Sequence, residues 1–273
     1  KIVVWDPSGN VVWTWDTHNY FSKQDFSTGL WTTLTGNTSY FDWTHANALW
    51  YDEIDDAVYL SSRNISRISK ISYSDSSIVW NLGKDVIDDI AITDSNAGVD
   101  CGSEIGNSYQ HTVFLDNGNI LTFDNGTYGT WDGGIDIYTS RVLEIEVIET
   151  ENGCESEVVW EYRLDSDNSL FSIEQSEENT DPLFGANFGA VQKLDNNNYL
   201  ITTSGNGGHV LEVNSDKEVV WESALNNQDA VGLVHRAHRV SGLYPVAYSV
   251  LKPSFEIVSD YDTYYLNDSD NIS

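Results

Sequence analysis

Apolar and polar residues alternate in short runs along most of the chain, and the runs come in pairs separated by polar turns. The clearest pair covers residues 111–116 and 119–124, with Asn117 and Gly118 between them. Asn-Gly readily adopts the positive φ angles of a tight two-residue turn, so this pattern predicts a β-hairpin. Related pairs occur at residues 45–51 and 57–60, and at residues 190–194 and 199–201. No segment has the sustained period of an amphipathic helix.

A second set of hairpins ends in tryptophan. Each member has an apolar strand, a polar turn and then two β-branched residues before the indole. The tryptophans are Trp13, Trp80, Trp160 and Trp221. They recur at intervals of roughly 60 to 80 residues, which is enough for two hairpins, or one four-stranded sheet. Four-stranded sheets repeated along a chain are typical of propeller blades, and we interpret the tryptophans as packing between successive blades.

The repeat therefore predicts an all-β fold, a β-propeller of four-stranded blades that occupies residues 1–250. We expect about five to six blades, with an incomplete N-terminal blade as one option. The first residues, Lys1 to Trp5, already lie inside a strand pattern, so we expect that the gene begins further upstream. Residues 251–273 are acidic and rich in tyrosine. They are interpreted as a closing strand, a tail or the start of a following domain.

Charge narrows the range of partners. The chain has 13 Lys and Arg against 43 Asp and Glu, which gives a formal net charge of -30. Such a surface repels phosphates, so nucleic acid and anionic membranes are not expected partners. No apolar run approaches the ~18 residues of a membrane span, so membrane insertion is not expected. The acidic residues form either a solvated surface or, in part, a structural cation site.

The two cysteines, Cys101 and Cys154, both lie in polar segments that contain glycine. A single disulfide would close a loop of about fifty residues, fit an oxidising compartment and contribute roughly 3–4 kcal/mol. Two free thiols are the alternative. A Cys-x-x-Cys motif is absent from the sequence, so no zinc site is expected.

Two histidines, His45 and His111, open the first strand of two of the related hairpins. The innermost strand of each propeller blade lines a central channel, so the repeat places both imidazoles near one axis. A lone histidine in a strand is usually structural. Two at equivalent positions favour a site, because imidazole can act as nucleophile, acid or base near neutral pH. The Asp124-Asn125 pair that ends the second hairpin is interpreted as a turn cap.

Several stretches carry a resemblance to a known family. They are Trp-Thr-His-Ala-Asn-Ala at residues 43–48, Leu-Ser-Ser-Arg at 60–63, Ile-Val-Trp-Asn-Leu-Gly at 78–83, Gln-His at 110–111, Phe-Asp-Asn-Gly at 123–126 and Ser-Arg-Val-Leu-Glu at 140–144. In order and spacing they resemble the bacterial arylsulfotransferases, densely from Trp43 to Trp160 and more loosely to about Tyr244. The resemblance implies a secreted or periplasmic six-bladed propeller. It also implies sulfuryl transfer from an aryl sulfate to a small phenolic acceptor through a sulfohistidine, with no nucleotide sulfate donor and no cofactor.

The resemblance also implies roles for individual residues. His45 and His111 match two channel histidines of the family, and Arg141 matches its channel arginine, which we assign to the sulfonate oxygens. Arg63 and Asn47 are further candidates for substrate binding at the channel wall. Loose transition states with charge on peripheral oxygens call for a cationic donor, and a departing phenolate calls for a proton donor.

The third hairpin departs from the family pattern. Its first strand begins Asn-Phe-Gly-Ala-Val at residues 187–191, without a histidine. The later histidines are His209, His235 and His238. None of them aligns with the nucleophile of the family, and we interpret His235 and His238 as surface or packing residues. The alternative function is therefore a catalytically degenerate extracellular propeller that serves as a binding or assembly module, including self-association.

Overall fold

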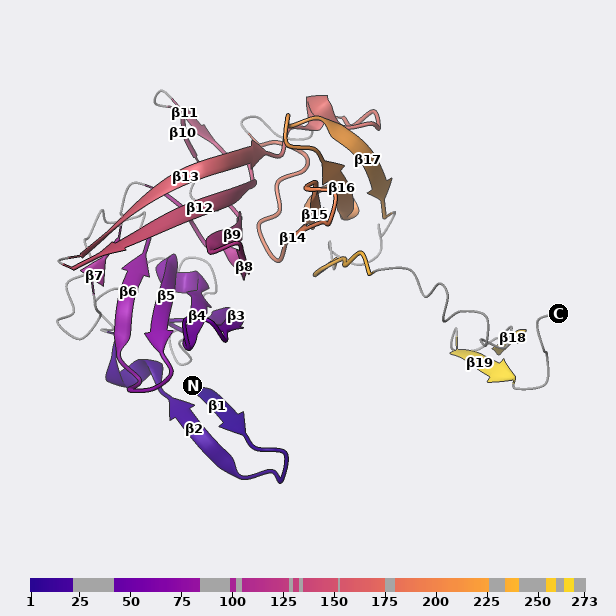
Figure 1. The fold of residues 1–273 in the computed structure, drawn as a ribbon. Coiled ribbons are helices and arrows are strands. Elements are labelled where there is room, and N and C mark those ends of the chain that lie inside the picture. The colour runs from indigo at the N-terminus through magenta and orange to yellow at the C-terminus, as the bar shows by residue number, and fades with distance from the viewer. Residues whose placement is uncertain are drawn as a thin grey trace. The chain divides into compact units, whose positions relative to one another are not determined.

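The computed structural model describes residues 1–21, 42–83, 99–101, 105–127, 130–132, 135–151, 153–174, 180–225, 234–240, 254–258 and 263–267. The chain divides into two units, residues 1–238 and residues 239–273. In the part of the chain that is described, the elements are β-strands joined by turns and by a few short 3-10 helices (Figure 1).

The first sheet of the larger unit has four antiparallel strands and one short parallel strand at its edge. The strands, in spatial order, are β3 (Ala46–Asp52), β4 (Ala57–Ser62), β5 (Arg67–Ser72), β6 (Ile78–Leu82) and β7 (Val99–Asp100). Strands β3 and β4 form the hairpin that the sequence predicts at residues 45–60. A 3-10 turn, η3 (Arg63–Ile65), joins β4 to β5.

The second sheet has four antiparallel strands. They are β8 (His111–Asp116), β9 (Asn119–Asp124), β12 (Arg141–Thr150) and β13 (Gly153–Arg163), in that spatial order. The turn between β8 and β9 has φ angles of 50° at Asn117 and 89° at Gly118. These two positive values explain why the sequence places Asn-Gly there, because few other residue pairs adopt them without strain.

The third sheet repeats the same order. It consists of β14 (Ala190–Lys193), β15 (Tyr199–Thr203), β16 (His209–Val213) and β17 (Val219–Ala224). Separate hairpins are formed by β1 (Ile2–Trp5) with β2 (Val11–Trp15), by β10 (Thr130–Asp132) with β11 (Ile135–Ile137), and by β18 (Ser254–Val258) with β19 (Thr263–Asn267). The last of these belongs to the smaller unit.

The predicted fold class is confirmed: the chain is all-β, and its repeated four-stranded antiparallel sheets have the strand order of propeller blades. The number of blades stays a prediction. The predicted domain boundary at residue 250 lies in residues 241–253, outside the described residues, and stays a prediction too. Of the C-terminal segment, the structure describes the β18–β19 hairpin.

Neighbouring sheets pack through apolar side chains. One cluster joins Ile68 and Leu82 of the first sheet to Leu143 of the second. A second cluster joins Val142 of the second sheet to Ile201 of the third. Each such side chain contributes roughly 1.5–3 kcal/mol when it is fully buried. The apolar residues that alternate along the strands therefore hold neighbouring sheets together.

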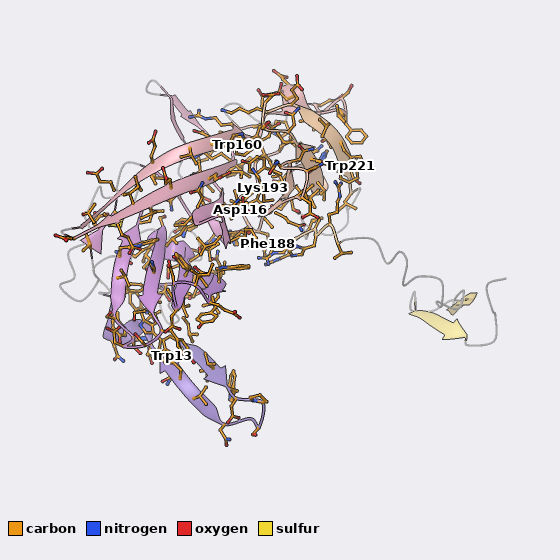
Figure 2. All side chains as sticks on the ribbon, in the orientation of Figure 1. Trp13, Asp116, Trp160, Phe188, Lys193 and Trp221 are labelled. Carbon is orange, nitrogen blue, oxygen red and sulfur yellow. A yellow bond between two sulfur atoms is a disulfide. The ribbon has the colours of Figure 1, made fainter. Side chains whose placement is uncertain are left out.

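The tryptophans of the second hairpin set lie at these contacts between sheets. Trp160, labelled in Figure 2, stacks on Tyr199 of the third sheet with ring centroids 3.7 Å apart. The indole of Trp80 donates to Glu149 at 2.7 Å. The indole of Trp13 donates to Ser76 of the first sheet at 3.0 Å. The interpretation as packing between blades is confirmed for these three residues. Trp221 differs, because it is 43% exposed.

A disulfide joins Cys101, which follows β7, to Cys154 in β13. Of the two alternatives for the cysteines, the disulfide is therefore correct. It links the edge of the first sheet to the outer strand of the second across 53 residues of chain. Although both cysteines lie near strand ends in polar, glycine-containing sequence, Cys101 is buried in the apolar cluster that contains Trp80 and Ile105, and Cys154 packs against that cluster.

Candidate functional site

The first strands of the three sheets begin next to one another. The side-chain amide of Asn47, near the start of β3, donates to the carbonyl of Gln110 at 2.8 Å, immediately before β8. The hydroxyl of Thr112 in β8 donates to the carbonyl of Gly189 at 3.2 Å, immediately before β14. These two bonds bring the strand starts together and gather the polar residues that precede or open each strand.

His111 opens β8, and its ring is buried. Its Nδ1 lies 2.7 Å from Oδ1 of Asn125. The pKa of His111 is lowered to about 4, chiefly by burial and to a smaller extent by the nearby groups Arg63, His45 and His235, against the opposing effect of the Asn125 hydrogen bond. The imidazole is therefore neutral at pH 7, and three groups from distant parts of the sequence act electrostatically on it.

His45 directly precedes β3 and is exposed. Its φ angle is 46°, in the left-handed region, and its backbone N–H donates to Asp42 at 3.2 Å. The other carboxylate oxygen of Asp42 forms a hydrogen bond with Nδ1 of the His45 ring. The local loop therefore holds the imidazole against a carboxylate, which orients the ring.

Arg63 begins η3 and lies between two of the strand starts. Its backbone N–H donates to the carbonyl of His45 at 3.1 Å. Its guanidinium lies over the ring of Tyr109, 4.2 Å from the centroid, and Nη2 donates to Asn187 at 3.4 Å. The cation–π contact holds a positive charge beside the imidazoles. The predicted substrate-binding role of Arg63 is untested, but its position beside His45 and within reach of His111 fits it.

The amide nitrogen of Asn47 donates to the carbonyl of Gln110. Its Oδ1 is buried and makes no hydrogen bond with the described residues. It lines a pocket of about 480 Å³ between β1 and β3. Apolar side chains form much of the wall, among them Ile2, Trp5, Leu49 and Leu60. The role of Asn47 in substrate binding stays a prediction.

A third histidine, His235, joins the group through Phe188. The Phe188 ring lies 6.3 Å from the ring of His111 and 5.1 Å from that of His235, by centroids. Phe188 has a φ of 62°, which is rare for a bulky residue. The segment that carries His235 is held to the third sheet by the backbone N–H of Ala237, which donates to Thr202 at 3.0 Å.

Sequence reasoning interpreted His235 as a surface or packing residue, and it is indeed exposed and in contact with Phe188, but its connection to His111 through that ring was not predicted. A signal was present in the order of the repeats. Each tryptophan-ended hairpin is followed by the segment that starts the next inner strand, so His45 follows Trp13 and His111 follows Trp80. His235 follows Trp221 in the same way. Fewer residues separate His235 from Trp221 than separate the other two histidines from their tryptophans, and this difference in spacing hides the equivalence in the sequence.

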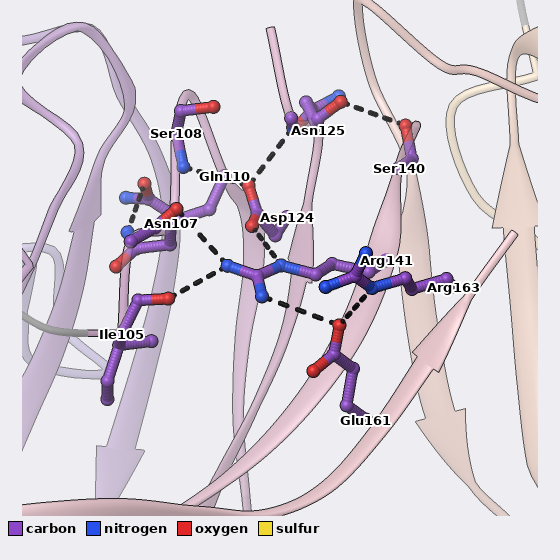
Figure 3. Close-up of polar contacts among 12 residues, drawn as sticks. Ile105, Asn107, Ser108, Gln110, Asp124, Asn125, Ser140, Arg141, Glu161 and Arg163 are labelled. Atoms are coloured by element: carbon purple, nitrogen blue, oxygen red, sulfur yellow. Dashed lines mark hydrogen bonds and ion pairs between the residues drawn. The ribbon is translucent and has the colours of Figure 1, made fainter. Parts of the chain in front are cut away.

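Arg141 opens β12 and has a different set of neighbours (Figure 3). Its Nε donates to Asp124 at 2.7 Å, and Nη1 approaches Glu161 at 3.4 Å. Nη2 donates to the carbonyls of Ile105 and Gly106 at 2.8 Å and 3.1 Å. Burial acts to lower the pKa of Arg141, but the carboxylates of Asp124 and Glu161 outweigh it and raise the pKa. The hydrogen bonds of its guanidinium go to protein acceptors and do not join it to His111, so its role at the sulfonate oxygens stays a prediction.

His209 lies apart from this group. It is buried in β16, where Nδ1 lies 2.7 Å from Glu222 and Nε2 lies 3.3 Å from the amide of Asn206. No group of His, Cys, Asp and Glu suited to a metal ion occurs among the described residues. In the same part of the chain, none of the helices has the length and apolar character needed to cross a bilayer.

The fold and the site together define a repeated-sheet protein with histidines at the starts of the first strands of two sheets and an arginine, Arg63, in the turn after β4. The sequence pattern of the family "Arylsulfotransferase (ASST)" matches residues 1–231, and the chain belongs to this family. Comparison with curated proteins gives no match. Among solved structures, BamB from Moraxella catarrhalis is similar with a TM-score of 0.33 and 11% identity. That match covers 67% of this chain and 40% of the BamB chain, so the chain spans well under half of that protein.

Proposed function

We propose that the protein transfers a sulfuryl group from an aryl sulfate to a phenolic acceptor through a histidine. Membership of the arylsulfotransferase family supports the reaction class. The observation that carries the proposal is the buried ring of His111, which Phe188 contacts together with His235, at strand starts where Arg63 is bonded to the backbone of His45. Donors and acceptors would be small phenolic compounds, and no nucleotide sulfate donor or other cofactor would be required.

We assign the nucleophile to His111. Its Nδ1 is engaged with Asn125, so a lone pair on Nε2 is the part of the ring left for chemistry. The lowered pKa keeps the ring neutral at pH 7, and only a neutral imidazole can attack sulfur. In the first half-reaction the Nε2–S bond forms and the S–O bond to the aryl group breaks, and the electron pair leaves on the phenolate oxygen.

The leaving phenolate then needs a proton. His45 fits this role because it is exposed and its ring is oriented by the carboxylate of Asp42. In the second half-reaction the imidazole of His45 takes the proton of the acceptor phenol while the phenol oxygen attacks sulfur. The S–N bond breaks, and its electron pair returns to Nε2 of His111. Both half-reactions balance without an added oxidant or reductant.

A cation must stabilise the sulfonate oxygens in the transition state. We propose Arg63 for this role, because its charge acts on His111 and its contacts place it beside His45. The resemblance to the family favours Arg141 instead. Its ion pair with the buried carboxylate of Asp124 supports a structural role for Arg141, and the two assignments give different outcomes when each residue is replaced.

The proposed location is outside the cytoplasm, either secreted or periplasmic. The disulfide between Cys101 and Cys154 supports this location, because such bonds persist mainly in oxidising compartments. The net charge of -30 is compatible with a solvated extracellular surface. The alternative function, a binding or assembly module without turnover, would retain the same site as a binding pocket for aromatic anions.

The test is an assay with para-nitrophenyl sulfate as donor and phenol as acceptor. We expect release of para-nitrophenolate that depends on the acceptor, and a loss of at least ~100-fold in His111→Gln. The matched control is His18→Gln, because His18 is exposed and lies outside the group around His111. If the wild-type protein binds aryl sulfates but does not turn them over, the module hypothesis replaces the enzyme hypothesis.

A further inference from the structure

Asn125 occupies a central place beside the candidate site and was not among the predicted site residues. It directly follows β9 and is fully buried. Its Oδ1 lies 2.7 Å from Nδ1 of His111, and its amide nitrogen lies 2.6 Å from the carbonyl oxygens of both Gly185 and Phe188. One side chain therefore connects the imidazole to the loop that precedes β14.

The orientation of this amide is determined by its neighbours. Gly185 and Phe188 present carbonyl oxygens, which only accept hydrogen bonds, so the –NH₂ group must face them. A rotated amide would place its oxygen against two other oxygens. The backbone of Asn125 is also held, because the hydroxyl of Ser140 donates to its carbonyl at 2.9 Å. Oδ1 is therefore fixed in the direction of His111.

The orientation of Asn125 in turn determines where the imidazole carries its proton. An amide oxygen accepts but cannot donate, so Nδ1 of His111 must be protonated to make the 2.7 Å bond. In a neutral ring the second nitrogen, Nε2, then has a lone pair and no hydrogen. A carboxylate at position 125 would accept the same bond, whereas an aliphatic side chain would not.

We propose that Asn125 is a positioning residue that fixes His111 in its Nδ1–H tautomer and holds Nε2 as the nucleophilic nitrogen. Its role in turnover rests on the proposed sulfuryl transfer. By bonding the carbonyl of Phe188, Asn125 also fixes the loop whose aromatic ring lies beside His111. One amide therefore positions both the nucleophilic ring of His111 and the aromatic ring of Phe188. Transfer reactions require this kind of preorganisation.

The charged and titratable groups that face His111 come from three elements. Arg63 lies in η3, His45 lies before β3, and His235 lies in the segment after β17. None of the three is an acidic residue, and Asn125 itself is neutral. Replacement of Asn125 by aspartate would therefore introduce a negative charge in direct contact with the ring. This makes Asn125→Asp a sensitive variant.

The test uses two-bond ¹H–¹⁵N correlation spectra of the full chain labelled with ¹⁵N-histidine, in which His111→Gln assigns the signal of His111. We expect the Nδ1–H tautomer in the wild-type protein and in Asn125→Asp. In Asn125→Asp the pKa of His111 should rise by about one to three units, because a carboxylate favours the charged ring. In Asn125→Ala we expect the Nε2–H tautomer to appear. The control is Asn117→Asp, an exposed turn residue in the same hairpin, which should leave the His111 signal unchanged.

Turnover provides the second measurement. We expect Asn125→Ala to lower kcat by about 10- to 100-fold, with a much smaller change in KM, because the nucleophile is misplaced and not removed. Asn125→Asp should retain more activity than Asn125→Ala at alkaline pH, and the acid limb of its pH profile should shift upward with the pKa of His111.

The two proposals fail in different ways. If the wild-type spectrum shows the Nε2–H tautomer, or if Asn125→Ala leaves the Nδ1–H tautomer unchanged, the positioning role is wrong even when the enzyme is active. If the tautomers behave as expected but no aryl sulfate is turned over, the proposed function is wrong. Should Asn125→Ala fail to fold, or Asn125→Asp because its second oxygen faces the carbonyls of Gly185 and Phe188, the wild-type tautomer decides the question alone.

Discussion

Arg141 and Asp124 are direct cross-strand partners between β12 and β9, and Nε of the guanidinium donates to the carboxylate at 2.7 Å. The Asp124 side chain is fully buried. Its second oxygen accepts the backbone N–H groups of Ser108 and Gly126, at 2.8 Å and 3.0 Å. The pair therefore ties the second sheet to the loops that precede β8 and follow β9.

We expect Arg141→Met to destabilise the protein by about 3–5 kcal/mol, because it leaves the buried carboxylate of Asp124 without its counter-ion. Urea unfolding at pH 7 measures this change. The matched control is Arg163→Met, since Arg163 pairs with Glu161 while 40% exposed and should cost less than about 1 kcal/mol. A stable Arg141→Met protein with a raised KM for aryl sulfates would instead support the role at the sulfonate oxygens.

Arg63→Gln tests the alternative assignment, in which Arg63 and not Arg141 stabilises the sulfonate oxygens. We expect kcat to fall by roughly 100-fold, because a preorganised cation at the developing charge is lost. The pKa of His111 should rise above its value of about 4, since the charge of Arg63 lowers it. Steady-state kinetics and histidine NMR measure the two effects. Unchanged kcat with a shifted pKa would show that Arg63 lies near the ring without serving the reaction.

The lowered pKa of His111 predicts a pH-dependent stability. Between the ordinary value of 6.5 and about 4, the unfolded chain binds a proton that the folded protein does not. The free energy of unfolding contributed by this residue therefore falls as the pH drops through that window, by roughly 3 kcal/mol in total. Comparison of the wild-type protein with His111→Gln by urea unfolding at pH 7.5 and 4.5 isolates the effect. A stability difference that does not depend on pH would contradict it.

The disulfide should contribute substantially to stability. In the loop-entropy model, a bridge across 53 residues stabilises the protein by about 4 kcal/mol. We expect the double variant Cys101→Ser and Cys154→Ser to unfold at a correspondingly lower urea concentration than the wild type. The reduced wild-type protein is the internal control and should match the double variant. Equal stability of the oxidised and reduced proteins would rule out this contribution.

Gly189 has no room for a side chain. A Cβ atom there would lie 2.3 Å from the buried ring of Phe123, and the φ angle of 123° already disfavours other residues. We expect Gly189→Ala to cost at least about 2 kcal/mol more than Gly118→Ala. Gly118 has a φ of 89° but nothing within 4 Å, so its replacement reports the backbone effect alone. Thermal unfolding of both variants measures the difference, and equal values would contradict the packing argument.

The fold could be predicted largely from local signals. Asn117 and Gly118 marked one hairpin through their need for positive φ angles, and the recurring tryptophans marked the contacts between sheets. The site was predictable only in part. His45 and His111 were found because they occupy equivalent positions at the start of inner strands, which a repeat pattern displays directly.

The rest of the site depends on register and on long-range packing, which the sequence does not display. Arg141 lies opposite Asp124 only because β12 pairs with β9 in one register, after an insertion that holds a separate hairpin. Asn125 resembled an ordinary turn cap, because its bonds to Gly185 and Phe188 span some sixty residues. His235 lay on an irregular segment whose position is set by packing on the third sheet.

The most direct test of the account is to locate the sulfuryl group on the protein. The wild-type chain is incubated with para-nitrophenyl sulfate without an acceptor, digested at alkaline pH and analysed by mass spectrometry. We expect a mass gain of one sulfuryl group on the peptide that contains His111, lost on addition of phenol and absent in His111→Gln. A sulfuryl group on His45 or His235, or turnover without any modified histidine, would contradict the assignment of Nε2 of His111 as the nucleophile.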